Sequence, residues 1–321
     1  MSETKQNNTY VTLEELKTKF KHHINDELCV YKRCSCFYGD VIIIMRKMIG
    51  KKKFKTNESR NGIVDRMYAK FRANKLFVLD IIDMKNGSLR DKYMNKYMFK
   101  NTFYKVGKKV KPDKFDARLD RICSEGIHFF NCIDAAFYYE FLMPEYTGTW
   151  FNWNDNGQLI SKLKYENGEL SGKKTCWDNS GKLLSKTEYC NGLRHGLHIS
   201  WYSNRQKSYE GYYDKDIPDG RHASWHENGQ QFEEDIYQNG TNIGVSLRWN
   251  EKGCITSIRK FNNGKVEIFS RILSDKIEDE NKYILLSLSF VDKRQDDKIY
   301  TIEEIKKLLG TNHSLKELVI V

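Results

Sequence analysis

The sequence lacks long apolar runs. Its longest unbroken apolar stretch, at 41–45, is far shorter than the roughly 18 residues that a membrane-spanning helix needs. The first ten residues are polar, so no secretory signal peptide is expected. A cytoplasmic protein without a transmembrane segment is therefore predicted.

Motifs of several enzyme and cofactor classes are also missing. The chain contains no glycine-rich phosphate loop, no nucleophile elbow and no paired C-x₂-C spacing of a structural zinc site. The cluster of Cys29, Cys34 and Cys36 does not have that spacing, so free thiols are favoured there over a metal. The eight cysteines are expected to be reduced. We therefore predict no cofactor, no metal and no catalytic residue.

Positive charge is confined to the N-terminal part. Residues 1–147 contain 29 Lys and Arg against 18 Asp and Glu, whereas 148–270 contain 16 against 15 and 271–321 contain 9 against 10. The candidates for a basic patch are Lys51, Lys52, Lys53, Lys55, Lys108, Lys109 and Lys111. Such a patch attracts the phosphates of nucleic acid or anionic lipid. The simpler interpretation is a solvated surface that keeps the protein soluble.

A pattern with a period of 24 residues occupies 148–270. Its units are 148–171, 172–195, 196–219, 220–243 and 244–267. Each unit begins with glycine, at Gly148, Gly172, Gly196, Gly220 and Gly244. Each has tryptophan five residues later, at Trp153, Trp177, Trp201, Trp225 and Trp249. A period of this length marks a repeat protein, in which each unit must stack on its neighbours to bury a core.

Each unit is predicted to form a β-hairpin. Pairs such as 156–157 after the tryptophan, and Asn-Gly pairs such as 167–168 at the end of the unit, supply the positive φ of tight turns. The third unit is irregular, because it has Asn204-Arg205 and Lys215-Asp216 at these places. Alternation along the first strand predicts a packed face that contains the tryptophans.

The opposite, mostly polar face supplies the candidates for partner binding. They are Trp150, Lys174, His198 and His222. His198 and His222 occupy the same position in successive units. Two strands separate them by about 10 Å, which is too far for one metal ion.

The units resemble the variant form of the MORN repeat, on residues such as "GTWFNWNDNGQLISKLKYENG" and "GRHASWHENGQQFEEDIYQNG". The resemblance implies one elongated antiparallel sheet of paired hairpins. MORN arrays serve mainly as interaction scaffolds, and some are associated with membrane phospholipids. Bacterial relatives of the variant form are often labelled antitoxins, which implies binding to a partner protein.

The N-terminal region is predicted to be a mixed α/β domain. A capping box of Thr12 and Glu15 predicts a helix over 12–25. Strands are expected at 28–31, 41–45 and 77–82, and a helical piece at 90–100. Residues 104–139 fit two strands and a helix. In this segment Gly126 precedes a strand at 127–130, and Asn131 with Asp134 caps the helix.

The same segment, "YKVGKKVKPDKFD…CSEGIHFF", resembles an uncharacterised domain of proteins from giant DNA viruses and some phages. No activity comes with that resemblance. Cys123 and His128 could act as nucleophile and base only if the turn at Gly126 brought them together, and no third group orients them. A surface or satisfied core histidine is the favoured interpretation.

The C-terminal segment is predicted to be a small β-α-β cap. A strand is expected at 283–291, a helix after the capping box of Thr301 and Glu304, and a closing strand at 318–321. The fold class is therefore α+β, with domains at 1–147, 148–270 and 271–321.

A non-enzymatic scaffold for protein–protein interaction is the leading functional prediction, in a host cytoplasm if the protein is viral. The alternatives are binding to anionic lipid or nucleic acid through the basic domain, and an uncharacterised enzyme within 1–147.

Overall fold

The computed structural model describes residues 10–36, 39–51, 53–97, 100–122, 124–140, 143–253, 255–262, 264–271, 283–290 and 293–300. Its contacts divide the chain into two compact units. The first contains Met1–Glu169 with Asn179–Gly181, and the second contains Leu170–Asp178 with Lys182–Val321.

The first unit is built on an antiparallel four-stranded sheet in the order β1-β2-β4-β7. Its strands are β1 (Cys29–Cys36), β2 (Gly39–Arg46), β4 (Leu76–Asp83) and β7 (Lys109–Val110). Two smaller sheets pair β3 (Phe71–Ala73) with β8 (Ile127–Phe129) and β5 (Lys92–Tyr97) with β6 (Lys100–Lys105). The unit also contains a hairpin of β9 (Gly148–Trp153) and β10 (Leu159–Glu166).

Three short helices complete the first unit, namely α1 (Leu13–Lys19), α2 (Lys21–Ile24) and α3 (Ile133–Phe137). The predicted capping box is confirmed, because Thr12 accepts a bond from the Glu15 amide at 3.2 Å while Glu15 accepts one from the Thr12 amide at 2.8 Å. The helix expected over 12–25 is interrupted at Phe20, which ends α1 and precedes α2. The cap of α3 is Cys132 rather than Asn131 or Asp134.

The helix expected at 90–100 is wrong. This segment forms β5 and then enters β6, and the two strands pair directly, with Tyr93 opposite Tyr104. Both tyrosines are almost fully buried, whereas Met94 and Phe103, one position away, are exposed. Successive side chains of a strand point to opposite faces, so both tyrosines lie on the face toward the core. The burial of these two aromatic side chains outweighs the helix propensity of the lysines.

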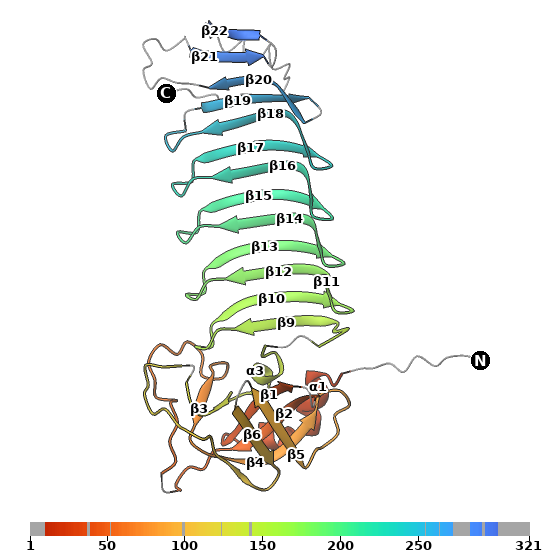
Figure 1. The fold of residues 1–321 in the computed structure, drawn as a ribbon, viewed down its shortest axis with the longest axis vertical. Helices are drawn as coiled ribbons and strands as arrows, with labels where there is room; N and C mark the ends of the chain where they lie inside the picture. Colours follow the sequence, from red (N-terminus) through yellow and green to blue (C-terminus); the bar gives the residue numbers. More distant parts are fainter. Residues whose placement is uncertain are drawn as a thin grey trace, which may run out of the picture. The chain divides into compact units, whose positions relative to one another are not determined.

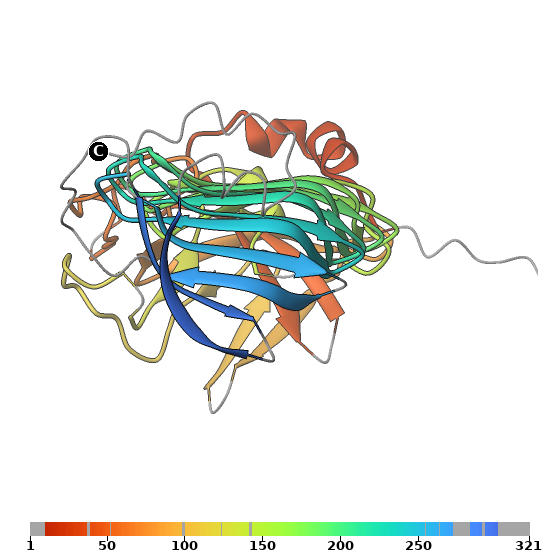
Figure 2. The same cartoon turned by 90° about the horizontal axis from the view of Figure 1, so that it is seen from above.

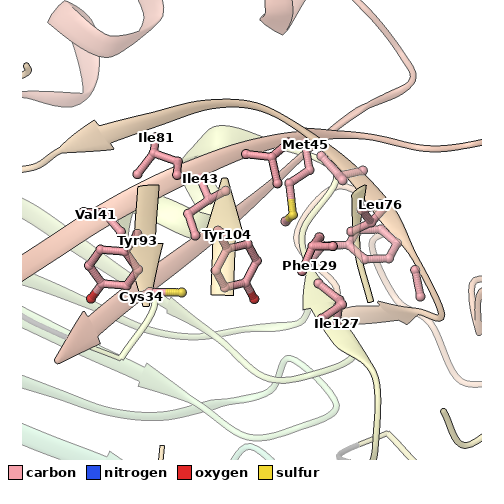
Figure 3. Packing of buried hydrophobic residues seen from close by; sticks show 14 of the residues in the cluster. Cys34, Val41, Ile43, Met45, Leu76, Ile81, Tyr93, Tyr104, Ile127 and Phe129 are labelled. Carbon is pink, nitrogen blue, oxygen red and sulfur yellow. The ribbon is translucent and has the colours of Figure 1, made fainter. Parts of the chain in front are cut away.

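An apolar cluster between these sheets forms the core of the first unit (Figure 3). Val41, Ile43, Met45, Ile81 and Phe129 are among its members, all with no exposed surface. The strand predictions at 28–31, 41–45 and 77–82 are confirmed by β1, β2 and β4. A strand that is buried on both faces has a continuous apolar sequence, and this is why such runs predict these strands.

Arg72 is a buried cation in this unit and organises a loop. Its guanidinium donates to the carbonyl oxygens of Asp116 at 2.9 Å and Ile122 at 3.0 Å, and also to those of Arg118 and Arg121. These converging carbonyl oxygens replace the water molecules that would otherwise solvate the buried positive charge. The Arg72 side chain therefore anchors residues 116–122, which contain no regular helix or strand.

The second unit is a stack of antiparallel strands in the order β12 to β22 (Figure 1). Seen from above, successive hairpins overlie one another (Figure 2). The strands are β12 (Gly172–Trp177), β13 (Leu183–Cys190), β14 (Leu193–Trp201), β15 (Lys207–Asp214), β16 (Ile217–Trp225), β17 (Gln231–Gln238), β18 (Thr241–Trp249), β19 (Ile255–Asn262), β20 (Lys265–Arg271), β21 (Tyr283–Phe290) and β22 (Lys293–Tyr300). A short strand, β11 (Glu169–Leu170), lies at the boundary of the two units.

The predicted hairpins and turns are confirmed. Asn191 and Gly192 both have positive φ, of 49° and 80°, as a type I′ turn requires. Lys215 and Asp216 in the irregular unit adopt the same geometry, with φ of 50° and 68°. Arg205 has φ of 73°, where the other units have glycine. Stacking on neighbouring units therefore imposes the turn shape even on residues that do not favour it.

Each unit also has a bulge at the same place. The pairing slips by one residue just before the tryptophan, so that Trp201 lies opposite Lys207 and Trp225 opposite Gln231. A bulge increases the local twist of a sheet. The repetition of this bulge therefore keeps the units equivalent.

The C-terminal segment begins as expected, because β21 matches the strand predicted at 283–291. It pairs with β22, at a place where no strand was expected, so the hairpin pattern extends beyond the fifth repeat. The helix expected after Thr301 and the strand expected at 318–321 lie outside the described residues. Within the described residues, no helix has the length and apolar character needed to span a bilayer.

Candidate binding surfaces

The first candidate, Trp150, is buried within the first unit, with only 4% of its surface exposed. Its indole packs edge-on against Tyr138 and Tyr146 at ring distances of 5.0 and 5.2 Å, and the Arg33 guanidinium lies 5.8 Å from the ring. The prediction that Trp150 belongs to an exposed contact surface conflicts with this burial. Trp150 instead attaches the β9–β10 hairpin to the N-terminal domain.

The turn of this first hairpin is held by the same domain. The amides of Val64 and Lys70 donate to the carbonyls of Asn156 at 2.9 Å and Asp155 at 3.1 Å. A Cβ atom on Gly157 would lie only 2.1 Å from the carbonyl oxygen of Asp65. The domain boundary expected at residue 147 precedes this hairpin, whereas the compact unit extends to Glu169.

His222 lies in a buried polar network of the second unit. It is 7% exposed, and its Nε2 donates to the carbonyl of Tyr212 at 2.7 Å. In the neutral ring Nδ1 therefore accepts the hydroxyl proton of Tyr209 at 2.6 Å, and Tyr209 in turn accepts from Tyr213 at 2.7 Å. Burial lowers the pKa of His222, which favours this neutral form.

Gly211 makes room for this network. It pairs with His222 across the strands, and an added Cβ would lie 2.5 Å from the Tyr209 hydroxyl and 2.7 Å from Nδ1 of His222. The histidine ring therefore folds over a position where the other units have side chains, namely Leu163, Thr187, Asp235 and Arg259. A ring enclosed in this way is not available to a partner.

His198 and Lys174 are less buried than His222. Nδ1 of His198 is bonded to the Thr187 hydroxyl at 2.7 Å, and its ring lies 5.5 Å from that of Tyr209. Burial lowers its pKa also. Tyr209 and Tyr213 stand between His198 and His222, with rings within 6.3 Å of each histidine. The two histidines therefore share a face, and tyrosine rings occupy the space between them.

The tryptophan face of the second unit is only half-buried. Nζ of Lys186 lies 5.9 Å from the ring of Trp201, and Nζ of Lys207 lies 4.9 Å from the ring of Trp225. Each lysine belongs to the hairpin before that of its tryptophan. The expectation that this is the packed face is therefore incomplete, because lysine chains cover the indoles and the deeply buried residues are divided between both faces. These are Thr187, His222, Asp235 and Ser246 on one face and Ala223 and Ile258 on the other.

Several charges on the tryptophan face are paired with one another. Glu210 contacts Lys207 at 2.5 Å and Arg221 at 4.0 Å, and Arg221 contacts Glu234 at 2.8 Å. Tyr212, on the same face, is 49% exposed. The surface therefore combines aromatic rings with a neutralised row of charges.

The two lysine clusters of the first unit converge. Asn74 bonds the carbonyls of Lys53 at 2.6 Å and Lys55 at 3.1 Å, and two residues later Leu76 pairs with Val110. Lys109 and Lys111 flank that valine. Lys51, Lys53, Lys55, Lys108, Lys109 and Lys111 are all exposed, and within the described residues none is in an ion pair. Lys52 lies outside the described residues.

The proposed pair of Cys123 and His128 is only half described. Cys123 lies outside the described residues, and His128 pairs with Arg72 between β8 and β3. Its Nε2 is buried and, within the described residues, has no hydrogen-bond partner. Burial lowers the pKa of His128 to about 3, so the ring is neutral at physiological pH.

Cys29 and Cys34 are buried thiols, as expected, and burial raises the pKa of Cys29 to about 12.

A cluster of His22, His23 and Asp80 was missed from the sequence. Each residue offers a ligand atom within 4.8 Å of those of the other two. The adjacent histidines were a visible signal, but Asp80 comes from a strand 57 residues farther along the chain. Only the packing of α2 beside β4 brings the three side chains together.

Residues 19–136 match a family of unknown function, DUF5758. The match begins at the end of α1 and ends within α3, so it includes all strands of the three small sheets. It agrees with the prediction of an uncharacterised N-terminal domain. No curated protein matches the chain. The DUF5758 segment contains both lysine clusters and the His22–His23–Asp80 cluster, whereas the repeat hairpins lie outside it.

Proposed function

We propose that the protein is a non-enzymatic scaffold that binds a protein partner on the tryptophan face of its repeat sheet. The observation that carries this proposal is the row of half-buried indoles at equal spacing on a face where Glu210, Arg221 and Glu234 are paired with opposite charges. Aromatic residues and arginine are enriched in the cores of protein interfaces, and unpaired charges are depleted there. The likeness of the glycine, tryptophan and Asn-Gly columns to variant MORN repeats supports the same role. A cytoplasmic location, in a host cell if the protein is viral, is part of this proposal.

Tyr212 is the most suitable probe of this face because its side chain is exposed. A photo-reactive aromatic residue at 212 in the full chain should form a saturable crosslink to a discrete protein in a lysate of the native cell. The matched probe is the same residue at Lys174, on the opposite face. Crosslinking of one protein at 212 alone supports the proposal, and equal labelling at both positions contradicts it.

A second candidate function rests on the convergence of Lys53, Lys55, Lys109 and Lys111 beside Asn74. Exposed lysines without carboxylate partners attract phosphates, whether of nucleic acid or of anionic lipid. The intact protein should then bind a single-stranded oligonucleotide or vesicles containing phosphatidylserine with an affinity that falls steeply as salt rises. Replacement of Lys108, Lys109 and Lys111 by Gln should weaken that binding, whereas replacement of Lys85 and Lys92 should not. Binding that is unchanged by salt would exclude this function.

The remaining alternative, an enzyme within 1–147, has less support. The Nε2 atom of His128 is buried and the ring is neutral, so it is poorly placed to act as a base on an external substrate. We expect the main effect of its removal to be on stability.

A further inference from the structure

The first unit contains a cluster of metal-binding side chains beside α2. Nε2 of His23 lies 2.6 Å from Oδ2 of Asp80, and the rings of His22 and His23 are 3.9 Å apart. The three potential ligand atoms all lie within 4.8 Å of one another. His22 is exposed, whereas His23 and Asp80 are partly buried. An ion could therefore enter from the side of His22.

His23 is held in place by its surroundings. The hydroxyl of Tyr31 donates to its backbone carbonyl at 3.2 Å, and its ring stacks near that of Phe20. The sulfur of Cys29 lies 4.0 Å from Nδ1 of His23.

Nε2 of His23 lies 2.6 Å from Oδ2 of Asp80, so without a metal a ring N–H on this nitrogen donates to the carboxylate. A metal ion would take the place of that proton and bind both atoms. Nδ1, the other ring nitrogen, has the Cys29 sulfur as its neighbour. Metal-binding histidines have the same pattern, in which the ring nitrogen that does not bind the metal donates to an outer partner.

We propose that His22, His23 and Asp80 bind one divalent transition-metal ion, with Zn²⁺ as the best match. Two imidazoles and one carboxylate are a common protein ligand set for zinc, with water in the fourth position. Zinc-to-ligand bonds of about 2.0–2.2 Å place tetrahedral ligands roughly 3.4 Å apart. The His23–Asp80 contact must therefore open by less than about 1 Å, and exposed His22 must close by up to about 1.4 Å from the 4.8 Å limit.

The ligand set also argues against calcium and magnesium. Those ions prefer six or more oxygen ligands, whereas this cluster supplies two nitrogens and one carboxylate. The proposal is independent of partner binding by the repeat sheet, since all three ligands lie in the DUF5758 segment.

The test is a titration of the intact protein with Zn²⁺ against a chromophoric chelator, with metal content measured after desalting. We expect one zinc per chain and a higher melting temperature with zinc. His22→Ala and Asp80→Asn should each weaken binding by at least about 100-fold, because even outer partners of zinc ligands typically account for 10–100-fold. His22 is exposed and Asn has the shape of Asp, so both variants should fold, which circular dichroism can check.

The matched control is His195→Ala. His195 forms a similar pair with Asp214 at 3.0 Å in the second unit, and no third ligand was identified beside it among the described residues. This variant should bind zinc as tightly as the unmodified protein. The proposal is overturned if the intact chain retains no zinc, or if His22→Ala and Asp80→Asn bind it as tightly as the control.

Discussion

The two units of the chain bury their residues in different ways. The first has a conventional core, in which residues such as Val41, Ile43 and Phe129 are fully enclosed by strands on several sides. In the second, a single sheet has two partly exposed faces, and among its described residues four of the six deeply buried side chains are polar. Those polar groups bond to neighbouring side chains or to the backbone, as His222 does with Tyr209 and Tyr212.

The difference indicates two sources of stability. Burial of apolar surface stabilises the first unit, and this contribution does not depend on the relative orientation of the side chains. Hydrogen bonds stabilise little on balance but are expensive to leave unpaired, so the repeat sheet depends on every bond in its register being made. Substitutions that shorten a buried apolar side chain should therefore destabilise the first unit most. Substitutions that remove a single hydrogen-bonding atom should destabilise the second.

The largest effect is expected from Phe129→Ala. This ring has no exposed surface and packs 5.9 Å from that of Phe71. Its removal should lower the free energy of unfolding of the first unit by about 3–5 kcal/mol. Hydrogen exchange followed by mass spectrometry can assign the loss to that unit. Equal loss of protection in residues 196–249 would show that the two units unfold as one.

Gly157→Ala should have the next largest effect. A Cβ at this position meets the Asp65 carbonyl at 2.1 Å, and φ is +85°. Overpacking costs about 1–3 kcal/mol, in addition to about 1–2 kcal/mol for a left-handed backbone. The control is Gly192→Ala, where φ is +80° but no atom lies within 4 Å. Similar unfolding free energies for the two variants would contradict the tight contact seen at Gly157.

Acid should destabilise the first unit through His128. Its pKa is about 3 in the folded chain against 6.5 as a free side chain, so below pH 6.5 the unfolded chain binds more protons. This contribution to stability is complete above pH 6.5 and falls by about 2 kcal/mol by pH 5. Denaturant unfolding at pH 7 and pH 5 should show a smaller loss in His128→Leu than in the unmodified chain. An identical loss in both would indicate that His128 is already protonated or exposed.

A smaller effect, of about 1–2 kcal/mol, is expected from Tyr209→Phe in the repeat sheet. This variant removes one oxygen and leaves Nδ1 of His222 and the hydroxyl of Tyr213 without their partner. Amide exchange in β15 and β16 should accelerate. The control is Tyr212→Phe, whose exposed ring should tolerate the change. Equal exchange in the two variants would mean that the buried network does not stabilise the sheet.

The smallest change, and a gain, is expected from Arg205→Gly. Arg205 has an exposed side chain and φ of 73°, at a turn position that is glycine in the other units. Relief of the left-handed strain should stabilise the hairpin by about 1 kcal/mol, reduced in part by the greater freedom of glycine when unfolded. Slower amide exchange around the turn is the expected result. Faster exchange would show that the arginine side chain makes a stabilising contact.

Much of the repeat sheet could be predicted from the sequence because its constraints are local. Positive φ at Asn-Gly pairs and the alternation of side chains both act within a few residues. The same reasoning failed at β5 because a segment rich in lysine and tyrosine shows neither a helical nor a strand periodicity clearly. The strand is stabilised by the pairing of Tyr93 with Tyr104, which is a contact with another strand.

The candidate sites were harder to predict for a related reason. Trp150 lies outside the tryptophan column, and its burial depends on Tyr138 and Arg33, which belong to other elements. His222 is enclosed because Gly211 opposite it is small, a property of the neighbouring strand. Asp80 joins His22 and His23 only through the packing of the first unit. Each of these depends on contacts that no short sequence pattern encodes.

The turns beside the tryptophans give the array a direction. The hydroxyl of Tyr202 donates to the carbonyl of Trp225, and the amide of Asn204 donates to the carbonyl of Glu227, in both cases 23 residues ahead. His226 and Asn228 repeat these bonds one unit later, to Trp249 and Glu251. At these turns the third and fourth units therefore donate to the unit that follows, whereas turns at the other edge donate backward, as the Asp216 amide does to the carbonyl of Arg194 at 2.9 Å. A cut between the third and fourth units would leave unpaired donors on the tryptophan-side turn of the N-terminal piece and unpaired acceptors on that of the C-terminal piece. The two ends of a shortened array would therefore differ chemically and would require different caps.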